Sequence, residues 1–183
     1  MQGNLIDGAG GPDALRALEE ARIAKTWQHY YEDHGYQLWG FSPSPTARIF
    51  AQAILDSNPR RSERVEIVDW GCEHGRDSLY FLELGFDVIG INVSERTVAL
   101  ARAAYVRQTA YPCWAALSFH AGDLHSVFKC RTEQRVHAFF SNRVLHLLSE
   151  IDFREATGDA MTCMEKGAYF CVSARTQTTS TPR

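Results

Sequence analysis

The residues whose types and spacing are best suited to ligand binding lie in one tight turn, Gly71-Cys72-Glu73-His74-Gly75, which follows the mostly apolar run 65–70. That run is too short for a helix, and the stretch 76–84 after the turn is compatible with one, so we predict a strand, a turn and a helix. Glycine lets a ligand approach the backbone closely, and a helix N-terminus presents N–H groups to an anionic group. The turn is therefore a predicted cofactor site.

The spacing of glycines argues against a dinucleotide cofactor. A nicotinamide site requires Gly-x-Gly-x-x-Gly, which would place glycine at positions 71, 73 and 76. The chain has Gly71, Glu73 and Arg76 there, so one position of three fits. A nicotinamide-dependent oxidoreductase is therefore the least favoured of the three functions that the sequence suggests.

The turn instead resembles the first motif of class I S-adenosylmethionine-dependent methyltransferases, Asp-x-Gly-x-Gly-x-Gly, in the Gly-Arg-Asp-Ser variant of the small-molecule, thiopurine- and tellurite-type branch. The residues in register with that variant are Asp69, Gly71, Cys72, Gly75, Arg76, Asp77 and Ser78. Glu73 stands where the family has its middle glycine. We expect Glu73 to occupy a left-handed turn at a cost of about 1–2 kcal/mol, and its carboxylate to repel that of the cofactor.

The resemblance continues to about residue 175 and implies further cofactor contacts. Asn92 takes the place of the acidic residue that holds the ribose hydroxyls, so a neutral hydrogen bond replaces a charge-assisted one. Gly122-Asp123-Leu124 is similar to the adenine-contacting Gly-Asp-Leu of the family. The cofactor-binding residues implied by the resemblance are Trp39, Asp69, Gly71, Cys72, Glu73, Gly75, Asn92, Val93, Asp123, Leu124 and Ser141.

The elements that must position these residues alternate between strand and helix. We expect an α/β, Rossmann-like, doubly wound sheet of about five parallel strands, with helices on both faces. The expected strands are 65–70, 86–92, 117–121, 136–140 and 165–173, and the second expected helix begins with a Ser94 cap. Because ligands of such sheets bind outside the carboxyl ends of the strands, Gly71, Asn92, Asp123 and Ser141 should converge on one site.

Residues 1–60 are predicted to form an N-terminal helical cap or lid, and residues 61–183 the cofactor-binding core. The cap contains expected helices at 12–34 and 45–55, with an aromatic-rich segment, 27–41, between them. Those aromatic side chains either pack on the sheet or close over the site, the second role being implied by resemblance for Trp39.

The methyl transfer that the resemblance implies needs a catalytic base only if the acceptor atom still carries a proton when it binds. His146 is the candidate catalytic residue, because imidazole titrates near neutral pH and the residue follows the fourth expected strand. A histidine in an apolar stretch such as 145–148 is also a common packing residue. Tyr30, Tyr31 and Asn142 are weaker candidates.

The end of the chain departs from the family pattern. Class I methyltransferases usually add an antiparallel strand pair beside the fifth strand, and the polar segment 176–183 has no room for it. The fifth strand would then be an exposed edge, which soluble proteins cover or pair. We expect either a fragment of a longer protein or a partner chain, the simplest partner being a second copy in a homodimer.

Composition limits the function classes. The 183 residues are 45% hydrophobic with a net charge of −3, and the isoelectric point near 6.2 gives no general attraction to nucleic acid. We predict no membrane span and no signal peptide, hence a cytoplasmic protein. The five cysteines show neither Cys-x-x-Cys nor zinc-type spacing, so no metal is expected.

The resemblance implies S-adenosylmethionine as cofactor and methyl transfer to a small-molecule acceptor, with specialised metabolism as the expected setting. The alternative is a degenerate member that binds the cofactor weakly or not at all and acts as a structural or regulatory partner. Glu73, Asn92 and the missing strand pair are the features that favour this alternative.

Overall fold

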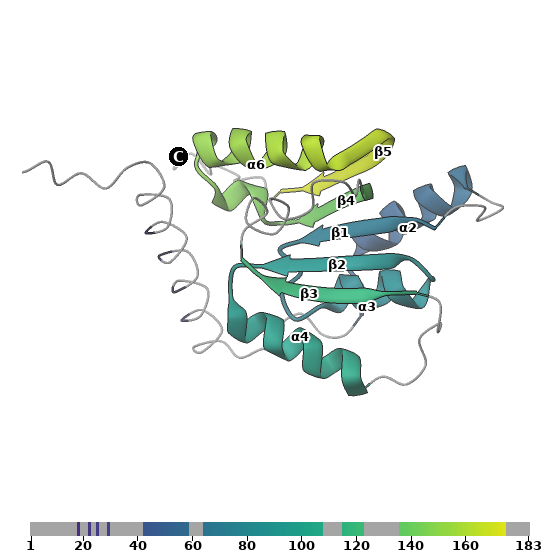
Figure 1. Ribbon diagram of the computed structural model, residues 1–183, viewed down its shortest axis with the longest axis horizontal. Coiled ribbons are helices and arrows are strands. Elements are labelled where there is room, and N and C mark those ends of the chain that lie inside the picture. The colour runs from purple at the N-terminus through teal and green to yellow at the C-terminus, as the bar shows by residue number, and fades with distance from the viewer. Residues whose placement is uncertain are drawn as a thin grey trace, which may run out of the picture.

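A computed structural model describes residues 42–58, 64–107, 115–122 and 136–174, together with the isolated helical residues 18, 22, 25 and 29. Five strands form one sheet in the order β3-β2-β1-β4-β5, and all neighbouring strands are parallel. The strands are β1 (Glu66–Trp70), β2 (Asp87–Asn92), β3 (Leu117–Ala121), β4 (Val136–Asn142) and β5 (Met164–Ser173). The helices are α2 (Pro45–Ser57), α3 (Arg76–Glu83), α4 (Glu95–Arg107), the short 3₁₀ helix η1 (Leu145–Leu147) and α6 (Glu150–Cys163). Figure 1 shows α4 on the β3 side of the sheet and α6 on the β5 side, and the predicted fold class is confirmed.

Serine side chains define three of the helix starts. Ser44, Ser94 and Ser149 each accept a hydrogen bond from the backbone N–H three residues on, at 3.1, 3.3 and 3.2 Å. Each serine thereby satisfies one of the N–H groups that a helix leaves without an intrahelical partner. The predicted Ser94 cap and the start of the helix at Pro45 are confirmed.

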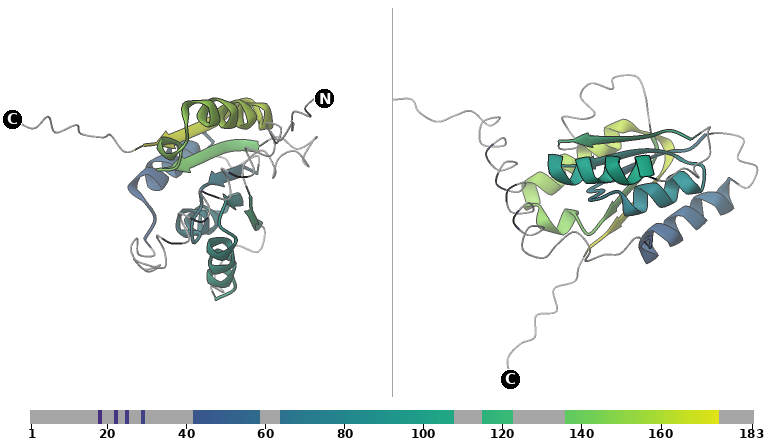
Figure 2. Two further views of the ribbon diagram at one scale, coloured as in Figure 1. Left: turned by 90° about the vertical axis from the view of Figure 1, so that its left-hand side faces the viewer. Right: turned by 90° about the horizontal axis from the view of Figure 1, so that it is seen from below.

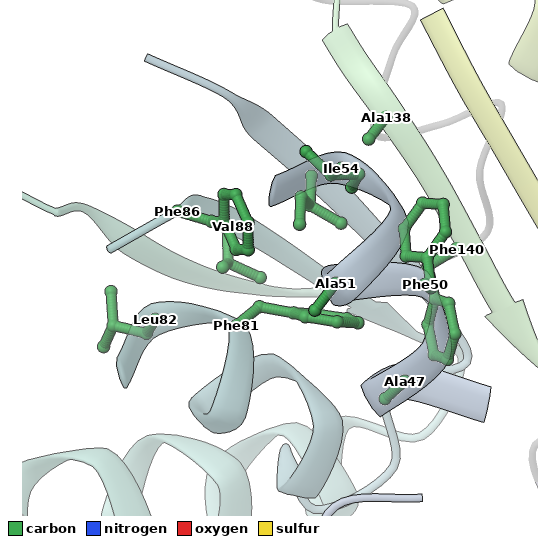
Figure 3. Packing of buried hydrophobic residues seen from close by; sticks show 11 residues of the cluster. Ala47, Phe50, Ala51, Ile54, Phe81, Leu82, Phe86, Val88, Ala138 and Phe140 are labelled. Atoms are coloured by element: carbon green, nitrogen blue, oxygen red, sulfur yellow. The ribbon is translucent and has the colours of Figure 1, made fainter. Parts of the chain in front are cut away.

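One face of the sheet packs against α2 and α3. The ring of Phe140 lies 5.4 Å from that of Phe50 on α2 and 5.1 Å from that of Phe81 on α3. Figure 3 shows these three rings between the two helices and β4, with Ile54 of α2 buried in the same cluster. Although α2 falls within the predicted cap, it is therefore part of the sheet's core. The boundary at residue 60 stays a prediction, and the segment before residue 42 lies outside the continuous described ranges.

The opposite face packs against α6. Ala156 and Ala160 of α6 are buried in one cluster with Val68, Ile89 and Phe139 of the sheet. The α4 helix lies on the first face near β3, where Val98 and Ala101 are buried in one cluster with Cys72 and Phe119. Figure 2 shows α6 and β5 together at one end of the molecule and α4 at the other. Helices thus cover both faces.

The β5 strand forms one edge of the described sheet. It begins at Met164 and contains Gly167 with a φ of +88°, close to where the register with β4 shifts between Val136 and Ala138. Phe170 stacks on Phe139 with ring centroids 5.1 Å apart, yet 45% of its surface is exposed. Among the described strands, β5 is therefore an edge strand, as predicted, and the absence of a cover stays a prediction.

The described helices include none that is both long enough and apolar enough to cross a membrane. The described part of the chain also holds no group of three or more His, Cys, Asp or Glu side chains that is placed to bind a metal ion.

Candidate functional site

A cavity of about 590 Å³ opens at the carboxyl ends of β1 and β4. Its volume is within the range of small-molecule sites, and its place at the strand ends is the one predicted for an α/β sheet. Its walls come from the start of α2, the β1–α3 turn and the segment that follows β4. The described residues that line it are Ser42, Pro43, Ser44, Pro45, Thr46, Asp69, Gly71, Cys72, Glu73, Arg76, Asp77, Asn142, Arg143, His146 and Leu147.

The β1–α3 turn is built from three left-handed residues. Gly71, Glu73 and Gly75 have φ values of +81°, +49° and +84°. The left-handed conformation predicted for Glu73 is confirmed, although it is costly for any residue with a side chain. A Cβ placed on Gly71 would lie 2.1 Å from Cγ2 of Val144, so the segment after β4 packs directly on this glycine.

The turn is tied to β2 by its own backbone. The N–H groups of Gly71 and Cys72 both donate to the carbonyl oxygen of Ile91, at 2.8 and 3.0 Å. The N–H groups predicted to face an anionic ligand belong to the start of α3, and these two, which precede that helix, instead hold the turn. Side chains and other backbone groups of the turn are left to make the ligand contacts.

Asp69 is a buried carboxyl at the base of the cavity. Its exposed fraction is 2%, and Ser78 Oγ donates to Asp69 Oδ2 at 2.5 Å. Burial, reinforced by the neighbouring Asp77 and then Glu73, raises the pKa of Asp69 to about 8. The group is therefore largely protonated at neutral pH, and a cationic ligand group beside it would favour its ionisation.

The thiol of Cys72 is not suited to nucleophilic chemistry. Burial first, then the neighbouring Asp69 and Glu73, raises the pKa of Cys72 well above its usual value. Because the thiolate is the reactive form of cysteine, this side chain acts as a packing group beside Phe119.

Asp77 joins three walls of the cavity. Its carboxylate accepts from Ser44 N–H and Ser44 Oγ, both at 2.7 Å, and from Arg76 Nε at 3.2 Å. Asn142 Nδ2 donates to the same carboxylate at 3.4 Å, and Asn142 Oδ1 accepts from Ser173 Oγ. The starts of α2 and α3 and the ends of β4 and β5 are thus connected by one set of hydrogen bonds, of which those between Ser44 and Asp77 are buried and the others partly buried.

Some predicted site residues lie together and others do not. His146, on η1, is exposed and lines the cavity together with four predicted cofactor residues, Asp69, Gly71, Cys72 and Glu73. The described lining of this cavity does not include the predicted residues Gly75, Asn92, Val93 and Ser141. Trp39, Asp123 and Leu124, and the weaker base candidates Tyr30 and Tyr31, lie outside the described residues.

Two of the predicted residues outside the cavity lining have structural partners. Asn92 Oδ1 accepts from the N–H of Ser94 at 2.9 Å, so this oxygen helps to set the start of α4. Ser141 is fully buried, and its hydroxyl donates to the carbonyl oxygen of Trp70 at 3.1 Å.

Sequence reasoning missed Ser44, Asp77 and Arg143 as residues of the site. Ser44 directly precedes the expected helix 45–55, and Asp77 belongs to the Gly-Arg-Asp-Ser motif. Their pairing across 33 residues was not readable from either signal. Nothing in the sequence around Arg143 indicates its left-handed φ of +62°.

Residues 67–167, more than half of the 183-residue chain, match the family described as "Methyltransferase domain". No curated protein matches the sequence. A solved structure of a protein studied for the conversion of a disulfide bond into a thioacetal group during echinomycin biosynthesis is 19% identical, with a TM-score of 0.61 over 81% of this chain. This chain spans 60% of that protein's length.

Two further solved structures share the fold. Magnesium protoporphyrin IX methyltransferase (ChlM) of Synechocystis PCC 6803 is 16% identical, with a TM-score of 0.58 over 80% of this chain and 72% of that one. TehB of Haemophilus influenzae is 19% identical, with a TM-score of 0.52 over 66% of this chain and 39% of that one. The chain therefore belongs to the methyltransferase domain family, as its resemblance to class I methyltransferases predicted.

Proposed function

We propose that this protein transfers a methyl group from S-adenosylmethionine to a small-molecule acceptor of specialised metabolism, in the cavity between the β1–α3 turn and the segment after β4. The observation that supports this most is that the motif residues Asp69, Gly71 and Cys72 line a cavity of about 590 Å³ at the carboxyl ends of β1 and β4. The family match and the S-adenosylmethionine bound to ChlM add support.

The residues of the turn fit this cofactor. S-adenosylmethionine, when bound, supplies an electrophilic methyl group on a sulfonium. The buried Asp69 carboxyl is suited to the cofactor's ammonium group, because a cation stabilises its ionised form. Most of the rate enhancement then comes from holding the acceptor in line with the methyl group. In well-oriented systems this lowers the activation barrier by up to about 7–11 kcal/mol. We also propose cofactor contacts from Trp39, Gly71, Cys72, Glu73, Gly75, Asn92, Val93, Asp123, Leu124 and Ser141.

We propose His146 as the base for an acceptor that arrives protonated. It is exposed at the cavity, on the 3₁₀ turn that directly follows the β4 segment packed on Gly71. Asn142, the weaker candidate, has its amide engaged with Asp77 and Ser173, so it is better suited to hold the wall than to accept a proton.

Calorimetric titration with S-adenosylhomocysteine tests the function. We expect a saturable heat with the wild-type protein and none with NAD⁺. Absence of both heat and thermal shift at millimolar S-adenosylhomocysteine would contradict the proposal and favour the degenerate, partner-protein alternative.

Replacing Glu73 by glycine is expected to tighten S-adenosylhomocysteine binding by roughly fivefold, about 1 kcal/mol. The substitution removes a carboxylate from the cavity and relieves the left-handed strain at φ +49°. Glu73→Gln is the matched control, since it removes the charge and keeps the strain. If both variants bind more weakly, Glu73 is instead a ligand of the cofactor's ammonium group.

We also propose that two copies pair through the edge formed by β5. Val172 is 36% exposed on this strand, and an uncovered apolar edge is an association site. Sedimentation at micromolar concentration should show a dimer, and Val172→Lys should shift it to monomer by placing a charge on the edge. Val106→Lys, at a 78% exposed residue of α4, is the control that should leave the dimer intact. A wild-type monomer that stays soluble and unfolds cooperatively would contradict this pairing.

A further inference from the structure

The side chain of Asp77 has its hydrogen-bonding capacity filled by the protein. It belongs to a residue that is 6% exposed, and its carboxylate accepts from Ser44 N–H, Ser44 Oγ, Arg76 Nε and Asn142 Nδ2. A carboxylate offers about four lone-pair sites, so these described donors are enough to occupy it. Although Asp77 lines the cavity, it is therefore suited to hold its neighbours in place rather than to bind a ligand itself.

The shortest of these contacts are with the start of α2. Both hydrogen bonds from Ser44 measure 2.7 Å and are buried, whereas those from Arg76 and Asn142 measure 3.2 and 3.4 Å and are partly buried. A hydrogen bond to an ionised group is roughly twice as strong as one between neutral groups, and burial keeps water from competing for it. Asp77, on α3, thereby fixes the first residue of α2's cap relative to the β1–α3 turn.

One fixed residue is sufficient to place a whole wall of the cavity, because the segment 42–46 is stiff. Proline fixes its own φ and restricts the preceding residue to extended backbone. Pro43 and Pro45 therefore restrict the serine before each of them, and Ser44 has an extended conformation with φ −63° and ψ 151°. Every residue from Ser42 to Thr46 lines the cavity. A displacement of Ser44 would thus move this wall as a unit.

We propose that Asp77 is a positioning residue, which holds the α2 wall of the cavity against the β1–α3 turn through Ser44 and thereby sets the affinity of the cavity for its ligand. This role rests on the proposed function, which supplies the ligand, whereas the anchoring of the wall does not depend on which ligand binds.

Variants at both ends of the contact test this role. Asp77→Ala removes all of the acceptor contacts, and Asp77→Asn keeps the shape of the side chain and one acceptor oxygen. Ser44→Gly removes the hydroxyl and keeps the N–H that donates to Asp77. Because glycine is tolerated at a helix N-cap, Ser44→Gly should fold.

The start of α6 supplies a matched control. Ser149 caps that helix as Ser44 caps α2, and Ser149 Oγ donates to Asp152 Oδ2 at 2.7 Å, the same distance as in the Ser44–Asp77 pair. The pair on α6 is exposed and does not belong to the described lining of the cavity. Asp152→Ala and Ser149→Gly therefore repeat the same chemical changes away from the cavity.

Calorimetric titration with S-adenosylhomocysteine measures the effect on binding. We expect Asp77→Ala to weaken binding about tenfold or more, and Asp77→Asn and Ser44→Gly about threefold, because each leaves buried polar groups without some of their partners. The double variant, Asp77→Ala with Ser44→Gly, should bind within about twofold of Asp77→Ala, since both changes act on one contact. Asp152→Ala and Ser149→Gly should bind as the wild-type protein does.

The neighbouring Asp69 cannot produce such a loss. After burial, the charge of Asp77 is the next largest contribution that raises the pKa of Asp69. Removing that charge favours the ionised form of Asp69, which by itself would strengthen binding of the cofactor's ammonium group. A weaker affinity therefore reports the position of the wall.

Amide hydrogen exchange followed by NMR gives a second readout, which needs no ligand. The N–H of Ser44 donates directly to Asp77, whereas Phe50 and Ile54 of the same helix are buried in the core. In Asp77→Ala the Ser44 amide should exchange about tenfold faster, with the amides of Phe50 and Ile54 within about twofold of the wild-type rates. A role limited to overall stability would not accelerate exchange selectively at Ser44.

Three results would overturn the role. Unchanged affinity in Asp77→Ala would limit Asp77 to stability, and losses that multiply in the double variant would make it a direct ligand contact. Exchange that rises equally at Ser44, Phe50 and Ile54 would show that Asp77 does not anchor the wall locally. If Asp77→Ala does not fold, Asp77→Asn and Ser44→Gly decide by the same criteria. Wild-type protein that binds no S-adenosylhomocysteine would contradict the proposed function, and the exchange measurement would still decide whether Asp77 holds the wall.

Discussion

Gly71→Ala is expected to lower the free energy of unfolding by about 2–5 kcal/mol. The left-handed φ of +81° contributes roughly 1–2 kcal/mol of strain once a Cβ is present. The added methyl would lie 2.1 Å from Cγ2 of Val144, and such overpacking costs about 1–3 kcal/mol. Urea denaturation of the variant measures the sum.

Alanine substitutions at two other glycines distinguish the cost of backbone strain from the cost of the steric clash with Val144. Gly167 has a φ of +88°, and in the described part of the chain nothing beyond its two neighbours lies within 4 Å of the place that a Cβ would take, so Gly167→Ala should show the strain alone, about 1–2 kcal/mol. Gly158, in the interior of α6, also has open space, and Gly158→Ala should stabilise by about 0.5–1 kcal/mol.

Val144→Ala in the Gly71→Ala background tests the collision directly. Removing Cγ2 of Val144 should recover most of the packing part of the loss, leaving the strain part. If Gly71→Ala is no worse than Gly167→Ala, Val144 moves aside readily and does not limit the turn.

Stability is expected to fall as pH rises from about 4 to about 8, because of Asp69. Its pKa is raised from 3.8 to about 8 in the folded protein, so the folded state keeps a proton that the unfolded chain has already released in that window. Raising pH then favours unfolding, by at most roughly 1.4 kcal/mol per pH unit and on the order of 5 kcal/mol in total. Urea denaturation at several pH values measures the slope. In Asp69→Asn this part of the slope should disappear, and an unchanged slope would contradict the assignment.

The same carboxyl should link cofactor binding to proton release. If Asp69 faces the ammonium group of the cofactor, binding lowers its pKa, and affinity for S-adenosylhomocysteine should rise with pH between about 6 and 8, by up to tenfold per unit. Calorimetry in buffers of different ionisation enthalpy measures the released proton. A flat affinity profile in the wild-type protein would place the ammonium group elsewhere.

Local sequence was sufficient to predict the strand–turn–helix at residues 65–84, the Ser94 cap and the parallel five-stranded sheet. Each of these depends on signals within a few residues: a short apolar run, glycine spacing, a serine before a helix. The left-handed conformation of Glu73 was predictable for the same reason, since it replaces a motif glycine in a turn of known shape. The cofactor contact of Asn92 stays a prediction, because its Oδ1 accepts from the N–H of Ser94 and the residue is not in the described lining of the cavity.

The properties that define the site depend on contacts between distant residues. Asp69 is protonated because the completed core excludes water around it, and Gly71 is constrained by Val144, which lies 73 positions later in the chain. The hydrogen bonds that join Asp77, Asn142 and Ser173 form because these residues come from different elements whose ends meet at one edge of the sheet. Periodicity and motifs report which element a residue belongs to, whereas burial, pKa and backbone strain arise only when the elements pack against one another.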